Sequence, residues 1–578
     1  MFLPTTKKEM DSLGWDRLDV ILVTGDSYID SPFVGVAIVG KLLLAEGFRV
    51  GVIGQPDISG ADITRLGEPR LFWGVSGGCI DSMVANRTAT GRPRKSDDYT
   101  PGGVNNRRPD RASLAYANLI RRFFKNTRPI VLGGVEASLR RVAHYDFWTN
   151  SVRRSILFDA KADYLLYGMT ERSIVELAGC LKDGGDPRGI RGLCYISKEL
   201  PDDCIELPSY EDSAKDKDAF TRAFQIFYNN NDPATARRLS QRHDVRYLVQ
   251  NPPALYLSRE ELDRVYGLRY ERDLHPYHRK DGEVKALETI RFSISTHRGC
   301  YGECSFCAIA VHEGRRVRSR SRASVIAEAK EIVRHPLFKG RIHDVGGPSA
   351  NMYASGCERM EKQGCCPKKS CISPKVCPLL HPGHAEQVSL LRELRSIDGV
   401  KKVVVASGIR HDMVLADKKD GERYLKELVC NHVSGQMKIA PEHSEAGVLQ
   451  KMGKQGSNSA ALIKFKELFY RFTKEAGMKQ FLSYYLMAAH PGCTDGDMKK
   501  LREFALKELG TVPEQVQVFT PTPSTYSTLM YWTGRDPSTG DTCFVEKSDK
   551  GRERQKSILT GPDIMKRNDK RHTQKRWR

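Results

Sequence analysis

Three closely spaced cysteines carry the clearest chemical signal in this chain: His297-Arg-Gly-Cys300-Tyr-Gly-Glu-Cys304-Ser-Phe-Cys307. The segment before them, residues 291–296, is predicted to be a strand, which places the cysteines on the loop just past it. A loop of this size can wrap one metal cluster and bring three sulfurs to one side. Iron–sulfur clusters normally take four cysteines, so three leave one iron open to a ligand from elsewhere. Zinc would instead recruit a nearby fourth ligand, for which His297 and His312 are candidates.

A second group of five cysteines follows in a segment rich in proline, glycine and lysine. Its spacing matches neither zinc-ribbon nor ferredoxin patterns. The group could hold an auxiliary iron–sulfur cluster, zinc together with His381 and His384, or no metal at all. Its members are Cys357, Cys365, Cys366, Cys371 and Cys377.

Length and composition limit the function classes. A chain of 578 residues exceeds the size of one hydrophobic core, so more than one domain is expected. Fifteen cysteines are too few for a disulfide scaffold of this length. No apolar stretch is long enough to span a bilayer, and the N-terminal residues show no secretory signal, so the predicted location is the cytoplasm. The net charge of +21 is compatible with an anionic partner such as RNA, or with a generally basic surface.

Short apolar runs alternate with helical patterns over the first 204 residues. This alternation predicts a doubly wound, flavodoxin-like parallel α/β sheet. Residues 205–285 are polar and mixed, and we expect a linker region of helices and loops. The strands predicted in the first domain are 20–24, 50–53, 71–75, 130–132 and 164–167.

A second alternation runs over residues 286–529 and suits a partial (β/α)6 barrel of the TIM type. Residues 354–384, with the second cysteine group, read as an insertion in it. Residues 530–578 are charged and poor in large aliphatic side chains, so a poorly ordered basic extension is expected. The strands predicted in the barrel are 291–296, 342–345, 403–406, 437–440, 481–487 and 516–519.

The cysteine triplet after the first barrel strand resembles the radical S-adenosylmethionine (SAM) superfamily. Further motifs follow in register, each after a predicted strand, where barrel active sites lie. They are Asp344-Val-Gly346-Gly347-Pro348, Ser407-Gly-Ile-Arg410, Ile439-Ala-Pro-Glu442-His443 and the HPG segment that ends in His490-Pro491-Gly492.

Almost the whole chain, residues 10–545, resembles the YgiQ family of radical SAM proteins, which have a cobalamin-binding-like N-terminal domain. The residues that carry this resemblance are Thr24-Gly-Asp-Ser-Tyr-Ile-Asp30, Gly133-Gly-Val-Glu136, the triplet, Val345-Gly-Gly-Pro348 and Val518-Phe-Thr-Pro-Thr-Pro523, with Met530-Tyr531 beyond.

The resemblance implies an enzyme in which Cys300, Cys304 and Cys307 bind a [4Fe–4S] cluster. An electron donor such as flavodoxin or ferredoxin reduces the cluster, which then cleaves SAM to a 5′-deoxyadenosyl radical that abstracts hydrogen from a substrate. The positions that match the family's contacts to SAM are Gly346, Gly347, Ser407 and Glu442.

The resemblance also raises the question of whether the N-terminal domain binds cobalamin. Related enzymes bind it through a DxHxxG loop whose histidine ligates cobalt, and here Tyr28 stands at the histidine position after Asp26. The fold could hold the corrin without that ligand or could lack the site. The alternatives are therefore a cobalamin-dependent radical methyltransferase, a methylthiotransferase-like RNA-modifying enzyme, or a non-catalytic, metal-stabilised nucleic-acid-binding protein.

The arginine-rich stretch GRRVRSRSR, residues 314–322, bears on the last two alternatives. It could contact a phosphate-rich substrate or could form a solvated turn. His443 and His490, at predicted strand ends, could likewise contact substrate or serve as structural hydrogen-bonding groups.

Overall fold

The computed structural model describes residues 1–367, 370–511, 513 and 516–561, and it divides into two compact units. Unit 1 consists of residues 1–298, 308–339 and 359–365. Unit 2 consists of residues 299–307, 340–358 and the rest of the chain from 366. Among the described residues no helix is both long and apolar enough to cross a bilayer.

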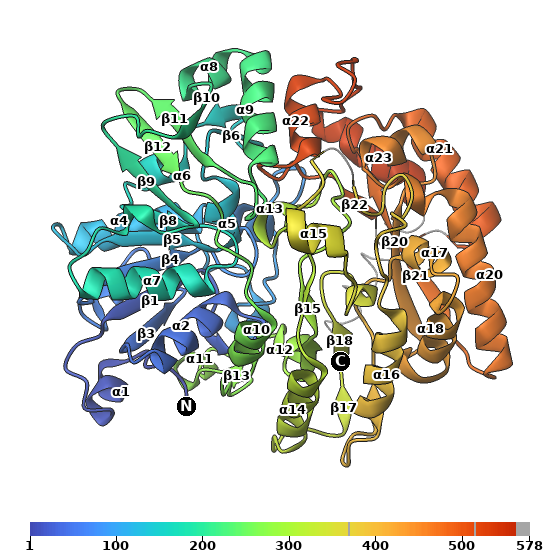
Figure 1. The fold of residues 1–578 in the computed structure, drawn as a ribbon, viewed down its shortest axis with the longest axis horizontal. Coiled ribbons are helices and arrows are strands. Elements are labelled where there is room, and N and C mark those ends of the chain that lie inside the picture. The colour runs from blue at the N-terminus through green and yellow to red at the C-terminus, as the bar shows by residue number, and fades with distance from the viewer. Residues whose placement is uncertain (368–369, 512, 514–515, 562–578) are drawn as a thin grey trace. The chain divides into compact units, whose positions relative to one another are not determined.

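Unit 1 is built on a nine-stranded sheet in the order β10-β11-β12-β9-β8-β5-β4-β1-β3 (Figure 1). Strands β3, β1, β4, β5 and β8 are parallel, which is the doubly wound, flavodoxin-like strand order. The strands of the sheet are β1 (Val20–Thr24), β3 (Val50–Gly54), β4 (Phe72–Ser76), β5 (Ile130–Gly133), β8 (Tyr164–Leu166), β9 (Leu193–Ser197), β10 (Cys204–Leu207), β11 (Arg238–His243) and β12 (Arg246–Gln250).

Helices cover the parallel part of this sheet. The crossovers β1-α2-β3 and β4-α4-β5 run in opposite directions, so right-handed connections put α2 and α4 on opposite faces. One core layer forms where Val20, Leu22, Val50 and Val52 meet Leu43 of α2. The longer helices of unit 1 are α2 (Gly35–Ala45), α4 (Ala112–Phe123), α7 (Glu171–Lys182), α9 (Lys217–Asn229), α10 (Arg259–Tyr266) and α14 (Arg322–Val333), and the shorter ones include α1 (Lys7–Ser12), α3 (Ser82–Asn86), α5 (Gly134–Leu139), α8 (Tyr210–Lys215) and α13 (Ile309–His312).

The expectation of helices and loops alone over residues 205–285 is corrected by β11 and β12. These strands pair with each other and extend the sheet from β9. Their buried side chains include polar residues, which hides the usual alternation. Gln241, for example, is 1% exposed because its amide donates to the Pro208 carbonyl and accepts from the Ala143 N–H. Short pairs β2 (Ile29–Asp30) with β13 (Asp273–Leu274), and β15 (His297–Arg298) with β16 (Arg318–Ser319), complete the strands used below.

Unit 2 repeats a strand–helix pattern with parallel pairing of β17 with β19 and of β20, β21 and β22 in that order. Helix α20 illustrates why these segments become helices. Its buried face has helical spacing and consists mainly of Leu462, Phe465, Phe469 and Phe472, and the Asn458 side chain caps its first turn. The elements are β17 (Arg341–Ile342), β18 (Asp344–Gly346), α15 (Glu358–Gln363, mostly in unit 1), α16 (His384–Arg395), β19 (Lys402–Val403), α17 (His411–Ala416), α18 (Gly421–Glu427), β20 (Gln436–Glu442), α19 (Ala446–Lys451), α20 (Ser459–Glu475), β21 (Phe481–Ala488), α21 (Asp495–Phe504) and β22 (Val516–Val518).

The C-terminal extension is ordered over the part that the structure describes, which corrects the prediction of disorder for residues 530–561. Helices α22 (Tyr526–Thr533) and α23 (Asp549–Thr560) form there, and α23 packs against α21. Helix α23 has few aliphatic residues because it buries polar ones: Gln555 is fully buried and Arg552 is 4% exposed. The basic tail, residues 566–578, lies outside the described residues.

Candidate functional site

The cysteine loop, residues 299–307, is held by three segments of unit 2. The Ser305 N–H donates to the Met452 carbonyl at 2.9 Å, and the Ser305 carbonyl accepts from the Ser527 N–H at 2.8 Å. The Phe306 ring meets His490 edge-on. These anchors follow β20, β22 and β21 respectively, so the loop is fixed at the carboxyl ends of those strands, where barrel enzymes place their chemistry.

Two sulfurs and one guanidinium surround Gly302 in this loop. A Cβ atom at Gly302 would lie 3.2 Å from the Cys300 Sγ, 3.5 Å from the Cys304 Sγ and 3.4 Å from Arg410 Nη1. The Gly302 N–H donates to the Cys300 sulfur at 3.3 Å. A side chain at residue 302 would therefore crowd both sulfurs and the Arg410 guanidinium.

The thiols of the triplet are not arranged for a single ion. Among the described residues no three Cys, His, Asp or Glu side chains converge on one metal-ion position. In a [4Fe–4S] cluster each cysteine binds a different iron, so its sulfurs surround the cluster instead of meeting at a point. Burial raises the pKa of the Cys300 thiol to about 11, so iron must displace its proton on binding.

Arg410 is the residue of this site whose contact the sequence did not predict. Its Nη1 lies 3.5 Å from the Cys304 sulfur, and its Nε donates to Asp412 at 2.9 Å. The sequence places Arg410 after the third barrel strand, but nothing in the spacing identifies a partner 106 residues earlier in the chain.

The predicted SAM-contact residues Gly346 and Ser407 lie together. A Cβ atom at Gly346 would lie 3.2 Å from the Ser407 Oγ. The Ser407 hydroxyl donates to Asp344, which also accepts from the N–H groups of Ala406 and Ser407. Asp344, the first residue of β18, thus ties this strand to the segment after β19. Gly347, partly buried, follows β18 directly.

Glu442, the fourth predicted contact, sits at the end of β20 with a φ of 68°. A positive φ is costly for a residue with a side chain, and strained positions of this kind cluster at active sites. The Glu442 carboxylate pairs with the buried Lys454 ammonium at 3.4 Å. Ala489, at the end of the adjacent strand β21, also has a positive φ, 60°.

The two histidines at strand ends are bonded within the chain. His490 contacts the Pro491 carbonyl through Nδ1 and the Ser527 hydroxyl through Nε2, at 2.8 and 2.7 Å. His443 accepts from the Glu445 N–H and lies 3.5 Å from the Cys493 sulfur. Burial lowers their pKa values, to about 3 for His490 and about 4 for His443, so both rings are neutral at physiological pH.

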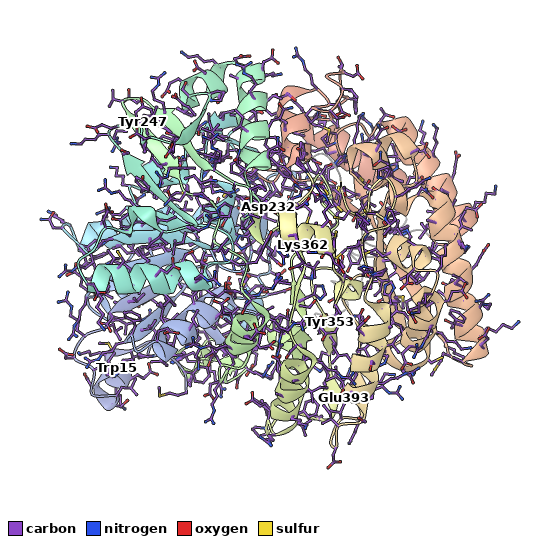
Figure 2. All side chains as sticks on the ribbon, viewed as in Figure 1. Trp15, Asp232, Tyr247, Tyr353, Lys362 and Glu393 are labelled. Carbon is purple, nitrogen blue, oxygen red and sulfur yellow. The ribbon has the colours of Figure 1, made fainter. Side chains whose placement is uncertain are left out.

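In the second cysteine group, no three possible ligands converge on one metal position among the described residues, which exclude Lys368 and Lys369. His384, one of its two candidate histidine ligands, is bonded instead to Asp417 at 2.8 Å. The Cys365 N–H donates to the carboxylate of Asp232, which is labelled in Figure 2. A metal on this group remains a prediction.

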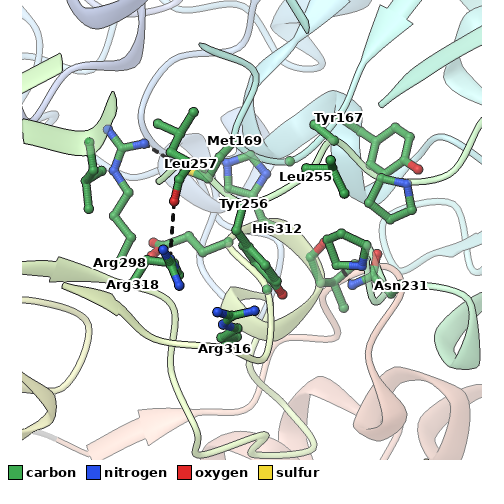
Figure 3. A pocket seen from close by; sticks show the side chains of 18 residues that line it. Tyr167, Met169, Asn231, Leu255, Tyr256, Leu257, Arg298, His312, Arg316 and Arg318 are labelled. Carbon is green, nitrogen blue, oxygen red and sulfur yellow. Dashed lines mark hydrogen bonds between the residues drawn. The ribbon is translucent and has the colours of Figure 1, made fainter. Parts of the chain in front are cut away.

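The arginine-rich stretch divides between two roles in unit 1. Arg320 is fully buried and pairs with Glu328, which makes it structural. Arg316 and Arg318 instead line a hollow of about 640 Å³, open mouth included, together with Arg298, His312 and apolar side chains (Figure 3). Arg316 and Arg318 share the single carboxylate of Glu361, which offsets one of their two positive charges.

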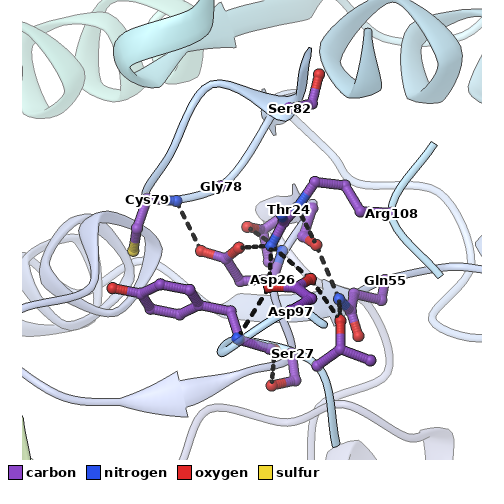
Figure 4. Close-up of polar contacts among 12 residues, drawn as sticks. Thr24, Asp26, Ser27, Gln55, Gly78, Cys79, Ser82, Asp97 and Arg108 are labelled. Atoms are coloured by element: carbon purple, nitrogen blue, oxygen red, sulfur yellow. Dashed lines mark hydrogen bonds and ion pairs between the residues drawn. The ribbon is translucent and has the colours of Figure 1, made fainter. Parts of the chain in front are cut away.

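The carboxyl edge of the unit 1 sheet holds a buried polar network at the point between β1 and β4 where the strand order reverses (Figure 4). Asp26, just after β1, accepts from Arg108 at 2.7 Å and from the Cys79 N–H at 2.6 Å. Arg108 also pairs with Asp97 at 3.0 Å, and neither the Arg108 nor the Asp26 side chain is more than 1% exposed. The glycines here serve close packing: a Cβ atom at Gly25 would lie 2.2 Å from the Gly77 carbonyl oxygen.

Tyr28 points into the core behind this network. It is fully buried, its ring stacks on His275 at 5.5 Å, and its hydroxyl accepts from the Leu3 N–H at 3.3 Å. The side chain at the position of the missing histidine is therefore enclosed by protein.

Comparison with known proteins defines the class. The radical SAM N-terminal family model matches residues 2–293, and the radical SAM superfamily model matches residues 294–505. The protein is therefore a radical SAM enzyme, a class that implies a [4Fe–4S] cluster and SAM.

The chain belongs to the UPF0313 family, which is the YgiQ family. It is 56% identical to a UPF0313 protein of Fusobacterium nucleatum subsp. nucleatum, over 97% of this chain and 98% of that protein. A UPF0313 protein of Thermotoga neapolitana is 49% identical over 96% of this chain and 98% of the relative.

Two solved structures share the fold at low sequence identity. The radical SAM methyltransferase TsrM from Kitasatospora setae, with cobalamin and a [4Fe–4S] cluster bound, has a TM-score of 0.50 and 16% identity, over 87% of this chain and 73% of its own. The cobalamin-dependent radical SAM enzyme OxsB, with aqua-cobalamin bound, has a TM-score of 0.50 and 12% identity, over 96% of this chain and 56% of its own. The predicted combination of a B12-binding-like domain with a radical SAM domain is confirmed as a fold.

Proposed function

We propose that Cys300, Cys304 and Cys307 hold the [4Fe–4S] cluster and leave its fourth iron to SAM. The observation that carries this proposal is that the sulfurs of Cys300 and Cys304 gather at one place, both within 3.5 Å of the position that a Cβ atom at Gly302 would take. Cys307 belongs to the same turn, since its N–H donates to the Cys304 carbonyl at 2.9 Å. When bound and reduced, the cluster supplies the electron that cleaves SAM to methionine and a 5′-deoxyadenosyl radical.

The contacts to SAM are assigned to the ends of three strands of unit 2. Gly346, the last residue of β18, and Gly347, the next residue, carry no side chain that would keep a ligand from their backbone, and the hydrogen bond between Ser407 and Asp344 fixes the neighbouring segment. Glu442 contributes a carboxylate whose direction is set by its backbone and by Lys454. These residues bind and orient, and their buried surroundings exclude water from a reactive radical.

The reaction proposed is abstraction of hydrogen from an unreactive C–H bond, with methyl or sulfur transfer as one outcome. A one-electron donor of the flavodoxin or ferredoxin class is proposed as the reductant. RNA is retained as a substrate hypothesis, supported only by the positive net charge and by Arg316 and Arg318 at the hollow of unit 1.

Formation of 5′-deoxyadenosine tests the proposed function. Anaerobically reconstituted protein, reduced with dithionite and given SAM, should release 5′-deoxyadenosine and methionine, measured by chromatography with mass detection. The same protein should be brown and should bleach on reduction, because thiolate- and sulfide-to-iron charge transfer absorbs visible light. Colourless protein that holds zinc and cleaves no SAM would support the nucleic-acid-binding alternative instead.

The residues of unit 1 do not fit a corrin at the strand-order reversal, and we propose that this site holds no cobalamin. Ligands of doubly wound sheets bind in the crevice at that point. Here Asp26, Arg108 and Asp97 fill it with their own ion pairs, and Gln55 closes it further by donating to Thr100 at 2.6 Å. Tyr28 cannot replace the cobalt ligand because it is enclosed in the core. The cobalamin-dependent alternative is therefore not favoured.

Incubation with hydroxocobalamin under anaerobic conditions should leave no bound corrin. After gel filtration, the visible corrin bands should be absent from the protein fraction, and mass spectrometry of the denatured fraction should find less than about one tenth of an equivalent. Stoichiometric retention, particularly if Arg108→Gln abolished it, would contradict this assignment.

A further inference from the structure

We infer that Arg410 is a positioning residue that raises the reduction potential of the cluster through the sulfur of Cys304. The inference rests on the proposed function, which places the cluster on the cysteine triplet. Arg410 Nη1 lies 3.5 Å from the Cys304 Sγ, and it would lie 3.4 Å from a Cβ atom at Gly302, a position that the Cys300 Sγ also approaches, at 3.2 Å. Residues that do not bind the metal themselves often tune its reduction potential by hydrogen bonding to a ligand, and a guanidinium beside a ligating sulfur can act in this way.

The guanidinium cannot turn away from the sulfur. Asp412 binds its Nε, at 2.9 Å, and its Nη2, which leaves Nη1 for the Cys304 sulfur. Asp412 is held in turn by the Ser457 hydroxyl at 2.9 Å. The Arg410 main chain is also fixed, because its N–H donates to the Asn351 side chain and its carbonyl accepts from it. A donor held in this way needs no rearrangement when charge changes beside it.

Charge and burial determine the direction of the effect. Reduction adds one negative charge to the cluster, and hydrogen bonds and positive charge near its sulfurs stabilise that charge. Arg410 is 7% exposed and Asp412 5%, so solvent screens their fields weakly. The Asp412 carboxylate opposes the effect, but it binds the other side of the guanidinium, so the ion pair presents its positive end to the sulfur.

A double variant, Arg410→Gln with Asp412→Asn, removes both charges without leaving an unpaired buried one. Its cluster should be titrated in the absence of SAM, with the reduced state followed by electron paramagnetic resonance. At a fixed potential we expect the ratio of reduced to oxidised cluster to fall about tenfold, which for a one-electron couple corresponds to a shift of about 59 mV to more negative values. Arg471→Gln with Glu422→Gln, which neutralises an exposed ion pair of unit 2, is the matched control and should leave the potential unchanged.

Three outcomes overturn the inference. The double variant with wild-type iron content could show an unchanged potential. It could show a weaker affinity for SAM at an unchanged potential, which would make Arg410 a contact to SAM. If the double variant held no cluster, Arg410→Lys would decide: a shift of the same sign and smaller size supports the inference, and no shift overturns it. Wild-type protein without any cluster would instead contradict the proposed function itself.

Discussion

Replacing Cys304 by alanine should reduce 5′-deoxyadenosine formation to the level of protein-free controls. Loss of this thiolate removes the only protein ligand proposed for one iron, and the visible absorbance of the cluster should be lost with it. The measurement is product formation from reduced protein and SAM, together with iron and sulfide content after reconstitution.

Cys430→Ala is the matched control for this variant. Cys430 is also a partly buried free cysteine of unit 2, but it belongs to neither cysteine group. Its replacement should leave iron content and product formation near wild-type values. A Cys304→Ala protein that kept both would show that the triplet does not hold the cluster.

Replacing Arg108 by methionine should lower the free energy of unfolding of unit 1 by about 3–5 kcal/mol, the typical effect of removing one partner from a buried ion pair. The change leaves the carboxylates of Asp26 and Asp97, which share Arg108, without their buried counter-charge. Urea unfolding followed by tryptophan fluorescence measures the effect, because Trp73 is fully buried in β4 of the same sheet.

Two further variants separate this effect from a general loss of charge. Arg121→Met removes a more exposed arginine paired with Asp163 on the same unit and should cost about 0–1 kcal/mol. Adding Asp26→Asn to Arg108→Met should recover part of the lost stability. A loss no larger for Arg108→Met than for Arg121→Met would mean that the strand-order reversal is open to water, and the argument against a corrin there would fail.

The sequence predicted the parallel strands of unit 1 because each is a short apolar run. The strand predicted over residues 20–24 is β1 with the same bounds, and the one predicted over 164–167 is β8, shorter by one residue. Strands β11 and β12 were missed because their buried side chains are polar and bonded to distant groups, as in Gln241. Apolar alternation does not reveal a strand of that kind.

The candidate site was predictable where it depends on local spacing and not where it depends on long-range contact. The cysteine triplet spans eight residues and can be recognised from its spacing alone. The pairing of Arg410 with Cys304, and of Arg108 with Asp26 across 82 residues, joins segments whose proximity only the fold creates. The roles of Gly346, Gly347, Ser407 and Glu442 toward SAM remain predictions.

The packing of α23 shows that the folded unit extends beyond the part of the chain that matches the radical SAM superfamily. The superfamily match ends at residue 505, yet the amide of Gln555 accepts from the Ala489 N–H and donates to the Cys493 carbonyl, at 2.8 and 2.9 Å. An excised fragment that stopped at the match would remove these partners from the turn after β21 and would expose the parts of α21 and β21 that contact α23. A fragment meant to preserve unit 2 should therefore include α23, which ends at Thr560.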